Sequence, residues 1–328
     1  MPNGMPLTKM NRIKNIIMEN TQMKNGFGKA LAEMGEDHKN LIVIGSDITK
    51  SVGTDLFKEK FPDRFISLGI AEQNAAAVSA GLSLSGKIPV FSTYAVFSAM
   101  RATDQIRISL CYNNIHAIIG GAHAGVSVGP DGATHQALED IAVMRSLPNM
   151  CVLSPCDENQ TKLATIAAIK ELSSPVYIRY GREPVPNFTS LNDDFKIGKA
   201  QILKEGKDIS IIATGSMVWT ALLVANQLKE NGFSADVINI HTIKPIDKNA
   251  IINSAKKTDK IITIEEHQIN GGLGGAVAEV LSQNYPTKMK ICGMPDSFGE
   301  SGNPHELLKL YKLDADSILI NCLQLINE

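Results

Sequence analysis

The chain has 328 residues, 44% hydrophobic and 20% charged, with a formal net charge of -2. This length can bury the core of two domains, and the nearly balanced charge argues against a nucleic-acid-binding protein. Five scattered cysteines do not suggest a disulfide framework, and no apolar run reaches the roughly 20 residues of a membrane helix. We therefore expect a cytoplasmic protein with no membrane partner.

Between residues 41 and 181, short β-branched runs alternate with longer amphipathic segments, which is typical of βαβ units. We expect strands at 41–47, 64–69, 88–94, 115–121, 150–156 and 175–181. We expect helical segments at 70–86, at 95–112, at 135–147 and after Asp157, whose carboxylate suits an N-cap.

Residues 183–198 lose this periodicity and gather Pro, Asn and Asp, as linkers do. The expected elements then resume, with strands at 209–215, 235–240, 260–266 and 290–294 and helices at 217–230, 247–256 and 274–283. This pattern predicts an α/β protein of two doubly wound, mainly parallel-sheet domains. We divide the chain into a tail (1–20), a first domain (21–190), a linker (191–198) and a second domain (199–328).

Two glycine-rich segments depart from the phosphate-binding loops that they suggest. "GLSLSGKI" (81–88) has Ile88 where a P-loop needs Ser or Thr, and it follows an expected helix instead of a strand. "NGGLGG" (270–275) lacks the G-x-G-x-x-G spacing, so we expect only a tight strand-to-helix turn there.

Glu72 is the one acidic residue of "FISLGIAEQNAAAVSAGLSLSGKIPV" (65–90). It falls in the first turn of an expected helix, where the helix dipole favours a negative charge. That helix has almost no polar face, so we expect it to be buried or packed against another chain. A buried carboxylate needs a partner or its pKa rises, and the residues alone leave a helix-end acid and a functional acid both open.

The segment "GVSVGPDGATHQ" (125–136) follows the expected strand 115–121, at the edge where parallel sheets bind ligands. It carries Asp131 and His135, and His123 lies just before it. Either a polar site or a surface turn fits this pattern. The histidine spacing does not suit a metal ion, and we expect no metal site in this chain.

The residues that carry a family resemblance are "GIAEQNAAAVSAGLSLSGKIPVFSTYAVFSAMRATDQIR", "GAHAGVSVGPDGATHQALEDIAVMRSLPNM" and "SPVYIRYGR". They resemble the pyrimidine-binding domain of transketolase. Residues 199–328, with "HTIKPID", "EEHQINGGLGGAVAEVL" and "PDSFGESGNPHELL", resemble its C-terminal domain. The resemblance covers nearly all of the chain beyond about residue 20 and implies the small subunit of a split transketolase.

The resemblance implies thiamine diphosphate as cofactor. The family holds its diphosphate and a Mg²⁺ or Ca²⁺ ion through a Gly-Asp-Gly motif and a later Asn, and this sequence contains no Gly-Asp-Gly. We therefore expect an N-terminal partner subunit to bind the diphosphate and its metal ion. The family's active sites lie between protomers, which implies a two-plus-two heterotetramer.

The resemblance also implies roles for single residues. Glu72 matches the glutamate that bonds the N1′ nitrogen of the aminopyrimidine, a role suited to a carboxyl whose pKa burial raises. Tyr94 and Phe97 match aromatic residues that stack around that ring, while Met100 replaces a third. Asp131 matches the residue that binds the C2 hydroxyl of the donor sugar, and His123 and His135 match histidines near the reacting carbons and the substrate phosphate, which are candidates for proton transfer. Arg182 matches an arginine that binds phosphate. Asp47 and Ser51 fall on a loop that in the family reaches the cofactor cleft.

One position departs from the family. Lys24 stands where many relatives have a phosphate-binding arginine, and lysine keeps the charge but lacks the planar fork. The implied reaction is transfer of a two-carbon ketol unit from a ketose to an aldose. The implied substrate is a sugar phosphate or a sugar with another anionic group.

Three alternatives remain. A deoxyxylulose-phosphate synthase shares "GIAEQ" but is normally one fused chain, and the β subunit of a 2-oxoacid dehydrogenase E1 has a similar length and fold. "GVSVGPDGATHQ" and "SFGESG" match transketolase better. The third alternative is a non-catalytic paralogue that binds a partner, against which the retention of Glu72, Asp131 and His135 argues.

Overall fold

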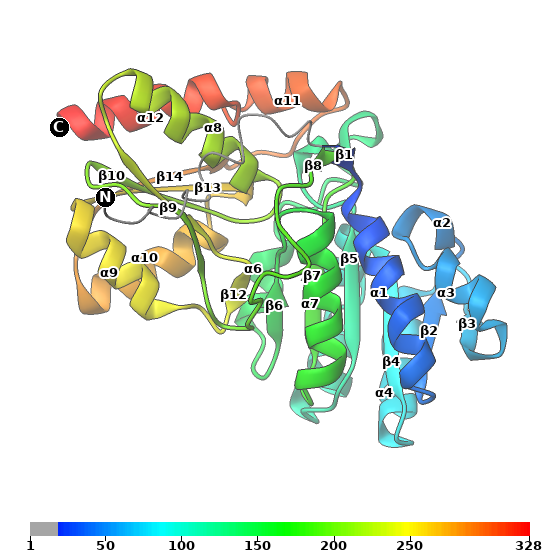
Figure 1. Ribbon diagram of the computed structural model, residues 1–328. Coiled ribbons are helices and arrows are strands. Elements are labelled where there is room, and N and C mark those ends of the chain that lie inside the picture. Colours follow the sequence, from blue (N-terminus) through cyan, green and yellow to red (C-terminus); the bar gives the residue numbers. More distant parts are fainter. Residues whose placement is uncertain (1–18) are drawn as a thin grey trace, which may run out of the picture.

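The computed structural model describes residues 19–328. It contains a seven-stranded and a five-stranded sheet, lying side by side, with helices packed against each (Figure 1). The expected mainly parallel α/β class is confirmed. Most of the expected tail (1–20) lies outside the described residues, and Asn20 already belongs to a strand.

The larger sheet has the strand order β12-β6-β7-β5-β4-β2-β3. All neighbours are parallel except β12, which pairs antiparallel with β6. The strands are β2 Leu41–Gly45, β3 Phe65–Ser67, β4 Ile88–Tyr94, β5 Ile118–Ala122, β6 Cys151–Leu153, β7 Val176–Arg179 and β12 Thr242–Lys244.

The helical segments around this sheet include short 3₁₀ (η2, η5) and π-helical (η3, η4) stretches. They are α1 Met23–Asp37, α2 Thr49–Val52, α3 Asp55–Lys60, η2 Pro62–Arg64, α4 Glu72–Leu84, η3 Phe97–Arg101, α5 Thr103–Gln105, η4 Ile106–Tyr112, η5 Val126–Asp131, α6 Asp140–Ser146 and α7 Glu158–Glu171.

Two of the expected helices are wrong in extent. The segment 95–112 is not one regular helix, because π-helical η3 and η4 flank a single turn of α5. The helix expected at 135–147 begins only at Asp140. Residues before it are held by other contacts: the Ala137 carbonyl accepts the Gly125 N–H, and the Gln136 amide donates to the Val126 carbonyl.

The smaller sheet has the order β14-β13-β10-β11-β9, with β9 antiparallel at one edge. Its strands are β9 Gln201–Lys204, β10 Ile209–Ala213, β11 Ala235–Asn239, β13 Lys260–Gln268 and β14 Lys288–Met294. Its helices are α8 Met217–Glu230, α9 Lys248–Thr258, α10 Leu273–Asn284, α11 Pro304–Leu310 and α12 Ala315–Asn327. The turn expected before α10 is present at Gly271 and Gly272.

Two strand pairings were not predicted from the sequence pattern. The aperiodic segment 183–198 contains β8 (Val185–Pro186), which pairs with β1 (Asn20–Thr21) in a separate two-stranded sheet. Strand β12 follows β11 in the chain yet joins the edge of the larger sheet. Strands of two or three residues carry too little periodicity to be recognised, and only a distant partner orders them.

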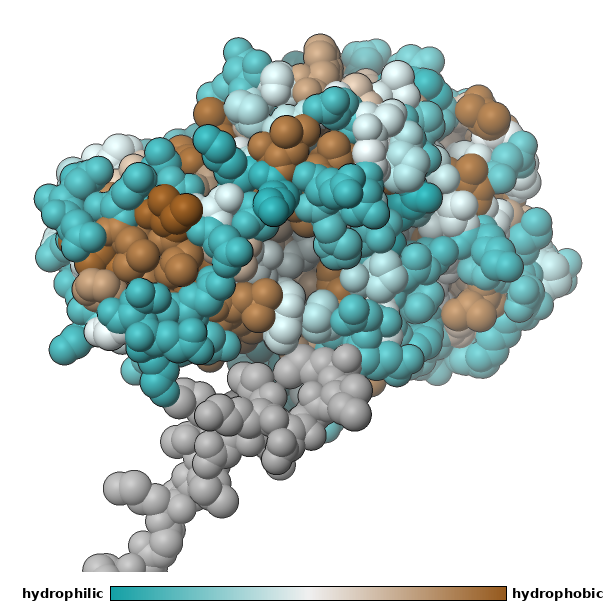
Figure 2. All heavy atoms as spheres, turned by 90° about the horizontal axis from the view of Figure 1, so that it is seen from above, coloured by the Kyte–Doolittle hydropathy of each residue, from teal (hydrophilic) through white to brown (hydrophobic). Residues whose placement is uncertain are grey.

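The cores consist of apolar side chains from both faces of each sheet. On the outside, Figure 2 shows separate brown patches set among hydrophilic residues on the face seen from above. Within residues 19–328, no helix is both long and apolar enough to cross a membrane.

The expected N-cap at Asp157 is confirmed, and its buried carboxylate does more than cap α7. It accepts the N–H of Gln160 at 2.9 Å, and it also accepts the N–H groups of Phe188 and Thr189 at 2.9 and 2.7 Å. One side chain therefore fixes both the start of a helix and the segment that leads to the second sheet.

We predict that Asp157→Ala lowers the free energy of unfolding by about 2 to 4 kcal/mol, because it removes a cap and leaves buried N–H groups unpaired. Asp314→Ala is the matched control, since Asp314 caps α12 through Ser317 in a less buried place and should cost about 1 kcal/mol. Urea unfolding of both variants tests this, and equal losses would contradict it.

Candidate active site

The residues that the resemblance singled out lie at the carboxyl edge of the larger sheet. Strands β2, β4, β5 and β7 are parallel neighbours, so the segments that follow them emerge on the same side (Figure 1). Tyr94 is the last residue of β4, and the segments after the other three strands carry Asp47, His123 and Arg182. Helix α4 begins with Glu72.

Glu72 is the first residue of α4, and only 2% of it is exposed. The partner that a buried carboxylate requires is Arg101, whose Nη1 donates to Glu72 Oε2 at 3.0 Å. The guanidinium of Arg101 also lies 4.4 Å from the ring centroid of Phe97. The planar guanidinium of Arg101 thus contacts both the Glu72 carboxylate and the ring of Phe97.

Arg101 was missed by the sequence reasoning. It is 29 positions from Glu72, a separation with no meaning within a helix, and only folding brings the two together. A weak signal existed, because Arg101 follows Phe97 by four residues in a segment expected to be helical, which places the two on the same face.

The aromatic side chains and histidines form one cluster. The Tyr94 and His123 rings are stacked with centroids 4.4 Å apart, and the Phe97 ring meets His135 edge-on at 5.3 Å. His123 is buried, and its Nδ1 has no hydrogen-bond partner in the described part of the chain. An unpartnered polar atom on a ring that stacks on Tyr94 suits a ligand that is flat and carries polar groups.

Positive charge borders this cluster. Arg182 pairs with Asp131 at 3.3 Å and donates through Nη1 to the Val128 carbonyl at 2.7 Å. Burial, together with the charges of Arg182 and Lys24, lowers the pKa of His123 to about 4. His123 is therefore neutral near pH 7, and its surroundings favour an anion.

Ser51 lies near His123, and Asp47 belongs to the same segment of the chain. Asp47 is exposed, has a φ of +60°, and accepts the hydroxyl of Ser67 at 3.2 Å. Ser51 approaches His123 through its backbone. The ε-ammonium of Lys24 donates to the Lys50 carbonyl at 3.2 Å. Ser51 in α2 and Lys24 at the start of α1 thus lie near His123, and the Lys24 side chain is tied to the backbone of α2.

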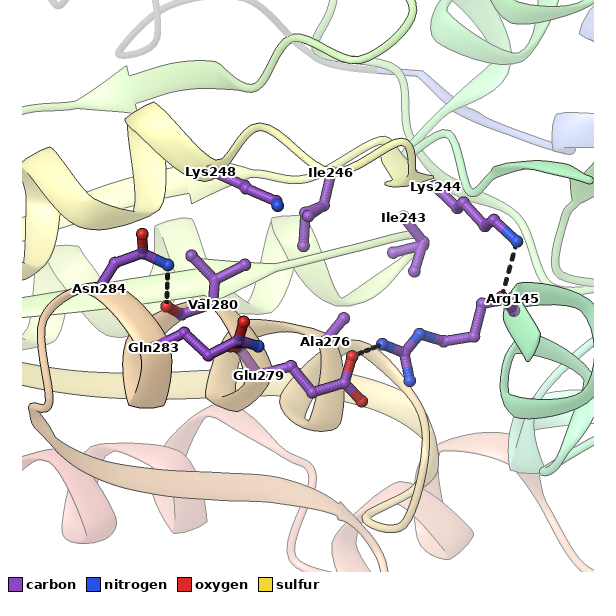
Figure 3. Close-up of a pocket in the computed structure, with 10 residues that line it drawn as sticks. All are labelled: Arg145, Ile243, Lys244, Ile246, Lys248, Ala276, Glu279, Val280, Gln283 and Asn284. Atoms are coloured by element: carbon purple, nitrogen blue, oxygen red, sulfur yellow. Dashed lines mark hydrogen bonds and ion pairs between the residues drawn. The ribbon is translucent and has the colours of Figure 1, made fainter. Parts of the chain in front are cut away.

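A concavity of about 280 Å³ lies elsewhere, where α6, α10 and the β12–α9 connection meet (Figure 3). Its charges are largely satisfied within the protein. Arg145 pairs with Glu279 at 2.5 Å, and the ammonium of Lys244 donates to the Arg145 carbonyl at 3.0 Å (Figure 3). It shares no residue with the cluster around Glu72. Among residues 19–328, no group of three or more His, Cys, Asp or Glu is placed to hold a metal ion.

Comparison with known families decides the relationship. The model described as "Transketolase, pyrimidine binding domain" matches residues 19–187, and that described as "Transketolase, C-terminal domain" matches residues 198–318. The chain belongs to the transketolase family. This family depends on thiamine diphosphate.

Several transketolase-family relatives are single subunits of similar length. A protein of Methanocaldococcus jannaschii described as a transketolase C-terminal section is 44% identical over 90% of this chain and 93% of its own. A 6-deoxy-6-sulfo-D-fructose transketolase subunit of Clostridium sp. (strain MSTE9) is 36% identical over 94% of this chain and 96% of its own. An apulose-4-phosphate transketolase subunit of Phocaeicola vulgatus is 38% identical over 93% of this chain and 97% of its own.

Solved structures agree with the transketolase fold. The structure titled "Split gene transketolase, inactive beta4 tetramer" has a TM-score of 0.87 and 44% identity, and it covers 93% of this chain and 98% of its own. Transketolase from Campylobacter jejuni, at 22% identity and a TM-score of 0.80, supports the fold, with 97% of this chain matching 49% of that one.

We predict that the buried state of His123 makes stability depend on pH. The pKa of about 4 in the folded chain lies below the usual value near 6.5, so the unfolded chain binds more protons between these values. Stability should therefore fall as the pH drops from about 6.5 to about 4. Urea unfolding at pH 7 and pH 5 should show a smaller drop in His123→Gln.

The drop will not vanish in that variant, because burial also lowers the pKa of His241 and of His267 to about 4. His305→Gln, which replaces an exposed histidine, is the control. A drop in His123→Gln as large as in the wild type would contradict the assignment.

We predict that Arg101→Met lowers the free energy of unfolding of the isolated chain by about 1 to 2 kcal/mol, because the Glu72 carboxylate loses its cation. The loss stays modest since Arg101 is 48% exposed and water can reach the site. Arg101→Lys keeps the charge and should lose less. Chemical unfolding measures both, and an unchanged midpoint in Arg101→Met would contradict the role of the pair.

Proposed function

We propose that this chain is the C-terminal subunit of a two-chain transketolase that transfers a two-carbon ketol unit from a ketose to an aldose. The observation that carries the proposal is the buried Glu72 carboxylate at the start of α4, in a chain of the transketolase family. Arg101 connects this carboxylate to the ring of Phe97, which in turn lies beside Tyr94. A carboxylate beside aromatic faces is the combination that the aminopyrimidine of thiamine diphosphate needs.

The residues present fit that end of the cofactor. Arg101 stacks a flat group on Phe97 and donates an N–H to Glu72, which shows that the space between them accepts a planar, nitrogen-bearing group. We propose that these residues would hold the aminopyrimidine: Glu72 would share a proton with a ring nitrogen, and Phe97 and Tyr94 would contact the ring. Arg101 then has to move aside. The bound cofactor supplies the electron sink for carbon–carbon bond cleavage.

The polar residues beyond the ring are proposed to bind the sugar. Asp131 would bind a hydroxyl of the donor, and His135 and the neutral His123 would accept and return protons on sugar oxygens. Arg182 and Lys24 would attract the anionic group, with Asp47 and Ser51 at the margin. An anion would partly cancel the charges that help to lower the pKa of His123.

We infer an anionic sugar as substrate from this charge. Two of the similar subunits are named for a sulfo-sugar and for a sugar phosphate, so phosphate and sulfonate are both candidates for the anion. Lys24, a point charge without the fork of arginine, suits either group because it does not demand bidentate geometry.

A partner subunit is proposed to complete the site. This chain has no Gly-Asp-Gly, so the diphosphate and its Mg²⁺ or Ca²⁺ are assigned to an N-terminal subunit, in a two-plus-two assembly. The expected packing of α4 against another chain has support, because large apolar side chains at and near α4 are exposed. They are Ile70, Leu84, Ile108 and Tyr112.

The division into a first domain (21–190), a linker (191–198) and a second domain (199–328) remains our proposal. A second candidate function is the corresponding half of a 1-deoxy-D-xylulose-5-phosphate synthase. The synthase of Halothermothrix orenii is 37% identical, but the chain spans only 48% of its length. Product analysis with pyruvate, in place of a ketose donor, distinguishes the two.

The experiment compares thiamine diphosphate binding by calorimetry between the purified chain and the complex that it forms in native lysate. We expect binding by the complex alone. Tight binding by the chain alone would overturn the proposed division of labour. Glu72→Gln should keep the assembly but reduce turnover about 10²- to 10⁴-fold. Near-normal turnover in this variant would refute the role of Glu72.

A further inference from the structure

We propose that Glu266, in the second sheet, is a positioning residue that sets the conformation of the loop 123–136, which carries Asp131 and His135. The inference deepens the proposed function and rests on it, because it concerns how the sugar-binding loop acquires its shape. No residue of the second sheet was assigned to the site by the sequence reasoning.

The contact between Glu266 and the loop is short and buried. Glu266 Oε1 accepts the backbone N–H of Ser127 at 2.5 Å, Oε2 accepts the hydroxyl of Ser216 at 3.0 Å, and the residue is only 3% exposed. A Cβ at Gly125 would lie 2.6 Å from Glu266 Cδ, and Gly125 has a φ of +93°. The loop therefore approaches the carboxylate at a distance that only glycine permits.

The rest of the loop is held by the segment before α11. The Gly302 N–H donates to the Gly129 carbonyl at 3.4 Å, and the Gln136 amide donates to the Glu300 carbonyl at 3.0 Å. Asp131 and His135 lie between or beside these points. The second sheet and its loops thus hold the loop at its beginning, middle and end, and the Glu266 contact is the shortest of the three.

A buried carboxylate at this position requires stabilising contacts, because burial raises the pKa of Glu266 and opposes its charged form. The charge of Arg179 opposes this effect and favours the carboxylate. Arg179 does not contact that carboxylate: its Nη2 donates to the backbone carbonyl of Glu266 at 2.8 Å, and its Nε pairs with Asp140 at 2.8 Å. Buried ion pairs add little net stability compared with apolar packing. A charge-assisted bond to one backbone N–H does fix geometry, which is what a substrate loop requires.

Glu265 provides a matched control. It is the neighbouring residue on β13, is fully buried, and has a pKa raised to about 7 by burial. Its carboxylate accepts the N–H groups of Leu273 and Gly274 at the start of α10. Adjacent residues of a strand face opposite sides of the sheet, so the two carboxylates serve different partners.

The first test measures hydrogen exchange in the isolated full chain. Glu266→Ala should speed exchange in peptides covering 125–136, while Glu265→Gln should affect only peptides near 273–276. Unchanged exchange at 125–136 in Glu266→Ala would overturn the proposal, as would the same acceleration in Glu265→Gln. If Glu266→Ala fails to fold, Glu266→Asp gives the same test. Its side chain keeps the charge but is one methylene shorter, so the carboxylate oxygens lie farther from the Ser127 N–H.

The second test uses the complex with its partner. Glu266→Ala should raise KM for the donor sugar about 10- to 100-fold while leaving thiamine diphosphate affinity within about twofold. Glu266→Gln should restore most of the loss, because its carbonyl oxygen can accept from Ser127 and its amide can donate to Ser216. If Glu265→Gln also raises KM, and the rise in each variant is proportional to the stability that it loses, then Glu266 is only structural.

The two proposals can fail separately. If the wild-type complex binds no thiamine diphosphate, the proposed function fails, but hydrogen exchange still decides whether Glu266 holds the loop. If the cofactor binds and the exchange pattern is unchanged in Glu266→Ala, the positioning role fails alone.

Discussion

Four neighbouring parallel strands, β7, β5, β4 and β2, end at one edge of the larger sheet, and the candidate site depends on that register. Parallel pairing sends every following segment to the same side, so residues more than a hundred positions apart meet. At one end of the site, Glu72 brings a buried negative charge beside Phe97. At the other end, Arg182 and Lys24 bring positive charge near His123. This separation of charge is the arrangement that the proposed function requires, with a nitrogen-rich ring at one side and an anion at the other.

The joint between the two sheets is polar as well as apolar. Asp140, Arg179 and Glu266 are buried together, and β12 adds a strand from the second series to the first sheet. Charged groups out of water must be paired with good geometry, so this joint has few alternative arrangements. The relative placement of the two sheets is therefore well defined, and this also fixes the position of the loop 123–136 between them.

Sequence reasoning succeeded where the signal is local. The long strands and helices, including β4 at 88–94 and α8 at 217–230, match their expected positions because hydrophobic periodicity is written in consecutive residues. The N-cap Asp157 was recognisable for the same reason. Family motifs identified the family itself because they are contiguous, while the roles that they suggest for Glu72 and the loop residues stay predictions.

Tertiary structure decided what consecutive residues cannot encode. The strands β1, β8 and β12 are too short to be recognised and exist because a distant partner supplies their hydrogen bonds. Arg101 pairs with Glu72, 29 residues away, and Glu266 accepts a hydrogen bond from Ser127, 139 residues away. The sequence determined which groups are available, and the packing of two sheets determined which of them meet, because a buried charge is stable only beside the partner that the fold brings to it.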